Sequence, residues 1–156
     1  MTRVLYALDP GTEQSALVSV CGEHVTGRIW PNADLLAELR AGSTLVPAHL
    51  VIEQIESFGM PVGREVFQTV FWAGQFAEAW DSGSSQKTWS LLPRRTVKLT
   101  LCGSARAKDA NIRQALIDKY GGPSCARKGG ALAGIKTHLW SALALAVTYQ
   151  QTEART

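Results

Sequence analysis

Two acidic residues stand where apolar segments end. Residues 4–8 (VLYAL) lead into Asp9, and residues 50–52 (LVI) lead into Glu53. An isolated buried charge is too costly, so each carboxylate needs a hydrogen bond, an ion pair or a metal. If the two segments are neighbouring strands, both acids meet at one sheet edge, as in many metal sites for phosphate chemistry. Asp9 alone could also be a turn former in Asp-Pro-Gly, and Glu53 a solvated edge carboxylate.

A third metal ligand is expected from a helix near these strand ends. His138 lies in the first turn of the last predicted helix, and Ser141 lies three residues on, on the same face. Imidazole binds several divalent ions, although Mg²⁺ prefers oxygen. Asp109 is a rival third acid, but its place at the start of another helix favours a capping role. A lone histidine can equally be a surface or capping residue.

The charge is unevenly divided along the chain. Residues 1–90 hold five lysines and arginines against ten acids, whereas residues 91–156 hold eleven against three. A basic half beside an acidic metal site favours a polyanion held across a cation-loaded cleft over a merely solvated basic face. The candidate phosphate-binding residues are Arg94, Arg95, Lys98, Arg106, Lys108, Arg127, Lys128 and Lys136.

Two large apolar side chains stand on a Gly/Pro loop just after Glu53. Phe58 and Met60 could insert between bases and unstack them, or they could fill the local core or a subunit interface.

The elements that must position these residues are predicted from periodicity and turn signals. Strands are predicted over 3–9, 15–21 and 24–30 as an antiparallel meander, then over 48–53 and 89–92. Helices are predicted over 33–41 with Asn32 as cap, and over 64–80, 93–101, from 109, and 136–150. Residues 123–133 are expected to be a flexible basic loop. The order predicts an α/β fold with a mixed five-stranded sheet and helices on both faces.

The predicted helix 64–80 is apolar on more than one face. Its main stripe includes Val66, Phe67, Val70 and Phe71, while Trp72, Phe76 and Trp80 lie off that stripe. The helix is therefore either deeply buried or has a second interface.

Size and composition indicate one globular domain over residues 1–150, with a frayed tail over 151–156. Hydrophobic residues make up 46% of the 156 residues, and no apolar run is long enough to span a membrane. Three widely spaced cysteines favour neither a zinc site nor a disulfide framework. We therefore expect a cytoplasmic protein.

Four segments together resemble the RuvC family of Holliday junction resolvases, with phage-encoded members the most similar. They are residues 7–12 (ALDPGT), 51–53 (VIE), 108–116 (KDANIRQAL) and 138–146 (HLWSALALA). The first alone is weak, since actin-like ATPases have a similar turn. The resemblance extends from Val4 to about Tyr149.

The resemblance implies an RNase H-like fold, a homodimer through helix 64–80, and cutting of branched DNA with Mg²⁺ or Mn²⁺, two ions per site. Asp9, Glu53 and His138 match catalytic ligand positions, and Lys108 matches a basic residue near the scissile phosphate. Phe58 lies where members insert an aromatic residue at the junction centre. Ser141 departs from the pattern, because many members have an aspartate there and a hydroxyl is a weak ligand. Asp109 or water could then substitute.

Three functions remain open on this basis. The first is a metal-dependent endonuclease that resolves four-way junctions, and other branched DNA, by paired phosphodiester hydrolysis. The second is a non-catalytic module that binds branched DNA, which the serine at position 141 motivates. The third, an actin-like nucleotide-binding domain, is disfavoured because the chain is short for two lobes.

Overall fold

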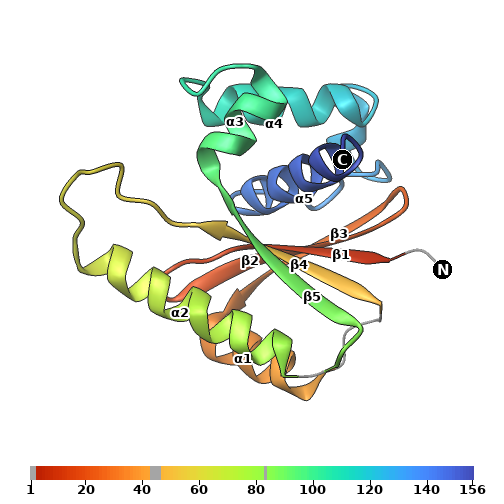
Figure 1. The fold of residues 1–156 in the computed structure, drawn as a ribbon. Helices are drawn as coiled ribbons and strands as arrows, with labels where there is room; N and C mark the ends of the chain where they lie inside the picture. Colours follow the sequence, from red (N-terminus) through yellow and green to blue (C-terminus); the bar gives the residue numbers. More distant parts are fainter. Residues whose placement is uncertain (1–2, 43–46, 83) are drawn as a thin grey trace.

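A mixed β-sheet lies between two layers of helices (Figure 1). The computed structural model describes residues 3–42, 47–82 and 84–156. The sheet has five strands in the order β3-β2-β1-β4-β5, which confirms the predicted mixed five-stranded sheet. The strands are β1 (Val4–Asp9), β2 (Gln14–Cys21), β3 (His24–Pro31), β4 (Ala48–Gln54) and β5 (Lys87–Pro93).

Strand directions bring three strand ends to one edge of the sheet. β1, β2 and β3 form an antiparallel meander, whereas β1 pairs in parallel with β4, and β4 with β5. In this register Leu8 lies opposite Ile52, and Glu53 lies opposite Leu92. The carboxyl ends of β1, β4 and β5 therefore meet at the same edge, because parallel strands point the same way.

The helices divide between the two faces of the sheet (Figure 1). One face is covered by α1 and α2, and the other by α3, α4 and α5. The helices are α1 (Asn32–Ala41), α2 (Arg64–Asp81), α3 (Arg94–Cys102), α4 (Asp109–Lys119) and α5 (Leu139–Glu153), with a 3₁₀ turn η1 (Pro123–Ala126). Within the described ranges no helix is long and apolar enough to cross a membrane.

Alternation along the strands fills a separate core on each face. On β1, Leu5 and Ala7 pack toward α5, whereas Leu8 packs toward α1 and α2. Successive side chains of a strand point to opposite faces. This periodicity also places Asp9 on the α5 side.

The last helix is displaced by three residues from its predicted span of 136–150. It runs from Leu139 to Glu153, so His138 precedes the first turn and the helix includes three residues of the predicted tail. Thr137 adopts a left-handed conformation with φ 49°. A helix cannot pass through a residue in that conformation, so α5 begins after it.

The segment 123–133, predicted as a flexible loop, packs against the core. Cys125 and Leu132 are both buried, and the backbone N–H of Leu132 donates to the carbonyl of Cys125 at 2.8 Å. The segment is mostly turns with exposed basic residues, as predicted, but its small and basic composition concealed these two apolar anchors.

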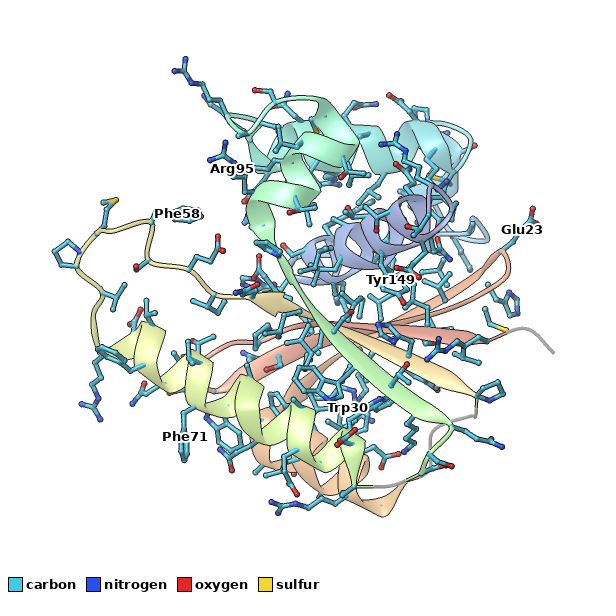
Figure 2. All side chains as sticks on the ribbon, in the orientation of Figure 1. Glu23, Trp30, Phe58, Phe71, Arg95 and Tyr149 are labelled. Atoms are coloured by element: carbon cyan, nitrogen blue, oxygen red, sulfur yellow. The ribbon has the colours of Figure 1, made fainter. Side chains whose placement is uncertain are left out.

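Helix α2 buries the face that lay off the main predicted stripe. Phe76 and Trp80 are fully buried against the sheet, whereas Phe67 and Phe71 are 65% and 71% exposed. Phe71 points away from the molecule in Figure 2. The helix thus has both of the apolar faces that its sequence predicted, and one of them faces outward.

Candidate functional site

Asp9 and Glu53 lie together at the sheet edge where β1 and β4 end. Their side chains are 10% and 12% exposed, and the two carboxyl groups hydrogen-bond each other. The parallel register of β1 and β4 brings them together, and both point to the α5 face. The structure therefore assembles the pair that the strand-end pattern predicted, in a nearly buried place.

Burial and mutual repulsion hold protons on this pair. Burial, and after it the neighbouring charge of Asp9, raises the pKa of Glu53 to about 7. Burial also raises the pKa of Asp9, against the lowering effects of the Glu53 hydrogen bond and the Arg94 charge. Two like charges in one low-dielectric site cannot both ionise freely. A bound cation would relieve this repulsion, so the pair could hold one.

A buried polar clamp fixes the loop that comes after Asp9. Ser15 Oγ accepts a hydrogen bond from the Gly11 N–H at 3.1 Å and donates to Asn32 Oδ1 at 2.6 Å. Asn32 Nδ2 donates to the Gly11 carbonyl at 2.9 Å. A Cβ on Gly11 would lie 2.3 Å from the Gln14 carbonyl oxygen, so only glycine fits this turn.

This clamp corrects the predicted role of Asn32 as a helix cap. Asn32 is the first residue of α1, Pro31 precedes it, and no side chain caps that helix end. The side chain of Asn32 instead binds the loop after β1, and so supports Asp9.

His138 reaches the acid pair from the start of α5. Its Nδ1 lies 3.3 Å from Asp9 Oδ2, although the side chain is 79% exposed. The left-handed Thr137 turns the chain at this point, and a β-branched residue in that conformation is a genuine outlier. Such strain is concentrated at functional sites. Ser141 lies one turn further along α5 and lines the same cavity as His138.

Arg94 joins the acid pair to Asp109. Its Nη1 lies 3.5 Å from Glu53 Oε1, and its Nη2 forms an ion pair with Asp109 Oδ1. Residue 94 begins α3 directly after β5, so the same sheet edge that holds the acids also presents this guanidinium. Asp109 is therefore bound to arginine, and its side chain is 85% exposed.

The donor set suits a divalent cation, but three ligands are not preassembled. Two buried carboxylates that repel each other are hard oxygen ligands of the kind Mg²⁺ and Mn²⁺ take. Across the described residues, no group of three or more His, Cys, Asp or Glu side chains is arranged to hold a metal ion. Arg94 lies on Glu53 and His138 lies on Asp9 instead. Asp9 and Glu53 would hold the ion, with His138 and Ser141 beside it.

Two hollows flank the acid pair and meet at Thr137 and His138, which line both. One, about 490 Å³, lies between α4 and α5 and is lined by Arg94, Arg113 and Trp140 among others. The other, about 900 Å³, includes Asp9, the loop after it and the first turns of α2. Asp9 lines the larger hollow, and Glu53 lines neither.

The other predicted DNA contacts line neither of these two hollows. Phe58 and Met60 are 67% and 69% exposed on the loop between β4 and α2, which projects from the sheet edge (Figures 1 and 2). Phe58 has a left-handed φ of 53°. Lys98 is half-buried; exposed positions hold Arg95, Arg106, Lys108, Arg127, Lys128 and Lys136.

Sequence reasoning missed several residues that surround or support the acids. Arg94 was predicted only as a phosphate contact, and neither Ser15 nor Arg113 was singled out. The signal for Arg94 was its position directly after the third parallel strand, at the edge where Asp9 and Glu53 end. Ser15 and Asn32 gave no such signal, because their hydrogen bonds to each other and to Gly11 form only once β2 and α1 are in place.

Comparison with solved structures places the fold. RuvC of Thermus thermophilus superposes with a TM-score of 0.69 over 97% of this chain and 96% of that chain, at 15% identity. T. thermophilus RuvC in complex with a Holliday junction substrate gives the same TM-score over 98% and 96%, at 16% identity. No family model and no curated protein sequence matches the chain. The fold is therefore that of RuvC, an RNase H-like fold, as the sequence motifs predicted.

Proposed function

We propose that this protein is a metal-dependent endonuclease that cuts branched DNA, with the four-way Holliday junction as its main substrate. The observation that carries the proposal is the buried Asp9–Glu53 pair at the edge of a RuvC-like sheet, with His138 beside it. A T. thermophilus protein of the same fold has been solved with a Holliday junction substrate, which supports the choice of DNA.

The acids and their neighbours have different roles in the proposed reaction. Bound Mg²⁺ or Mn²⁺, with two ions per site, would activate a water and stabilise the leaving 3′ oxygen of a phosphodiester. Asp9 and Glu53 would hold the cations, and His138 and Ser141 would complete the site. Lys108, at the start of α4, stabilises the negative charge that builds on the scissile phosphate.

The shape and charge around the site suit a DNA strand. Asp9 and His138 line a hollow of about 900 Å³, and Arg94 and Arg113 line the adjoining one of about 490 Å³. The exposed basic residues named above position phosphates and add affinity without sequence selection. Phe58 and Met60, on the projecting loop, unstack bases near the junction centre.

A homodimer would nick two opposed strands. We infer that α2 forms the dimer contact, because it exposes Phe67, Val70 and Phe71 as one apolar patch. Two copies related by a twofold axis would then present one acid pair each.

The test is a cleavage assay on a labelled four-way junction with Mg²⁺ or Mn²⁺, using a linear duplex of the same sequence as control. The wild-type protein should nick the junction in symmetric strand pairs, and Asp9→Asn should abolish nicking while retaining junction binding. No cleavage by the wild-type protein in either ion would overturn the proposal.

The same assay separates a second candidate, a module that binds branched DNA without cutting it. The absence of three assembled metal ligands among the described residues favours this alternative. Tight junction binding by the wild-type protein, without cleavage and unchanged in Asp9→Asn, would support it.

A further inference from the structure

Arg94 occupies the place at Glu53 where a cation is needed. Its guanidinium lies 3.5 Å from Glu53 Oε1, and its charge also acts on Asp9. Its side chain is 31% exposed, so it is only partly screened by solvent. A guanidinium is always charged and presents several donors in a fixed plane. The acid pair thus has an internal counterion.

A metal ion and Arg94 cannot share Glu53 without cost. A divalent cation bound by Asp9 and Glu53 would lie close to the guanidinium, and like charges a few ångströms apart repel strongly in a partly buried place. Arg94 must therefore leave Glu53 when the ion enters.

Asp109 is a second ion-pair partner of Arg94. It pairs with the other terminal nitrogen of Arg94, from the first turn of α4, and lies on the solvent side of the guanidinium. The arginine can release Glu53 and stay on Asp109, so its charge is never left unpaired.

We propose that Arg94 is a built-in competitor of the catalytic metal: it pairs with both Glu53 and Asp109 in the metal-free protein, leaves Glu53 and keeps only Asp109 when the ion binds, and so sets the metal affinity. Asp109 is then a positioning residue that acts through Arg94, and not a metal ligand. The inference rests on the proposed metal site.

The test is a binding isotherm for Mn²⁺ alone, measured by calorimetry and by the loss of the free-ion electron paramagnetic resonance signal. Arg94→Gln should bind Mn²⁺ at least about tenfold more tightly than wild type, because it removes the competing charge. Arg95→Gln is the matched control, since it removes the same charge from the next, exposed residue and should change the affinity less than about twofold. Circular dichroism and the melting temperature check that each variant is folded.

A double-mutant cycle assigns Asp109. Asp109→Asn alone should weaken Mn²⁺ binding several-fold, because Arg94 then pairs with Glu53 only. In the Arg94→Gln background the same change should have no effect, and a further loss of tenfold or more would identify Asp109 as a ligand and overturn its assigned role.

The outcomes separate this inference from the proposed function. Binding of Mn²⁺ with equal affinity in wild type and Arg94→Gln would overturn the inference and leave the metal site standing. Absence of binding in both proteins would overturn the inference together with the metal site.

Discussion

Glu53 has a pKa of about 7 in the folded protein, against an ordinary value of 4.5. Burial is the main cause, and the proximity of Asp9 adds to it. The folded state therefore keeps a proton that the unfolded chain releases between pH 4.5 and 7. The contribution of Glu53 to the stability of the metal-free protein should therefore be complete below pH 4.5, fall as the pH rises through this window, and then level off.

The first prediction concerns this residue. Glu53→Gln removes the buried charge, so it should raise the free energy of unfolding at pH 8, by on the order of 3 kcal/mol at most. At pH 4 the Glu53 carboxyl is protonated and as neutral as the glutamine amide, so the difference should vanish. Denaturant titrations in EDTA at several pH values measure this, with the exposed Glu56→Gln as control. Equal stabilisation at pH 4 and pH 8 would contradict the assignment.

Asn32 holds the loop that follows Asp9, so a change at this residue should affect both stability and the acid pair. Replacing it with alanine removes the hydrogen bond to the Gly11 carbonyl and leaves the buried Ser15 hydroxyl without its acceptor. We expect Asn32→Ala to lower the free energy of unfolding by about 1–3 kcal/mol and to reduce junction cleavage, because the loop after Asp9 loosens. Gln114→Ala, at an exposed position of α4, should cost less and leave cleavage unchanged.

At the scale of elements, periodicity and strand direction were enough to predict most of the architecture. Apolar alternation placed all five strands, and Gly42 marked the end of α1, where it adopts φ 69°. The start of α5 was misplaced because nothing in the local sequence shows that Thr137 is left-handed. The Asp9–Glu53 pair was predictable because strand direction alone brings the two ends together. The Arg94 bridge was not, because it depends on how α3 and α4 pack.

A hydrogen-bonded histidine joins three elements within the sheet and its helical cover. His49 on β4 is 5% exposed; its Nδ1 and Nε2 contact the hydroxyls of Thr88 and Ser90 on β5, at 2.7 and 2.8 Å. Its ring stacks on Tyr149 of α5 with centroids 4.4 Å apart. Burial, with a smaller effect of the Arg3 charge, lowers the pKa of His49 to about 4.

The sign of the resulting pH effect is opposite to that of Glu53. The unfolded chain binds a proton on this histidine below about pH 6.5, while the folded protein stays neutral down to about pH 4. Stability from this group should therefore be complete above pH 6.5 and fall as the pH drops to 4. This fall in the free energy of unfolding at acid pH is the acid limb of the stability curve. His49→Gln should remove its own share of that fall, on the order of 3 kcal/mol across the window. His24→Gln, at an exposed position of β3, should leave the limb intact; an unchanged limb in His49→Gln would contradict the prediction.

At the scale of the molecule, the two faces of the sheet have different tasks. The α5 face and its edge hold the acids, His138 and Arg94, whereas the α2 face ends in an apolar surface that faces away from the sheet. Arg64 and Gln68 border this surface, which includes Phe67 and Phe71. A polar rim around an apolar centre is typical of a subunit interface.

This surface gives the last prediction, a dimer through α2. A helix that pairs with its own copy about a twofold axis buries the same residues from both subunits. An arginine introduced at the centre of the contact is therefore present in both copies, and the two positive charges repel each other. Phe71→Arg should therefore convert a dimer into a monomer in sedimentation equilibrium at micromolar concentration. It should barely change the melting temperature of the subunit, because Phe71 is already 71% exposed. Phe58→Arg, equally exposed but outside α2, should remain dimeric. A wild-type protein that sediments as a monomer, or a Phe71→Arg dimer, would exclude α2 as the contact. If the dimer is what pairs the two cuts, the Phe71→Arg monomer should still nick a junction, but in single strands that are no longer matched across it.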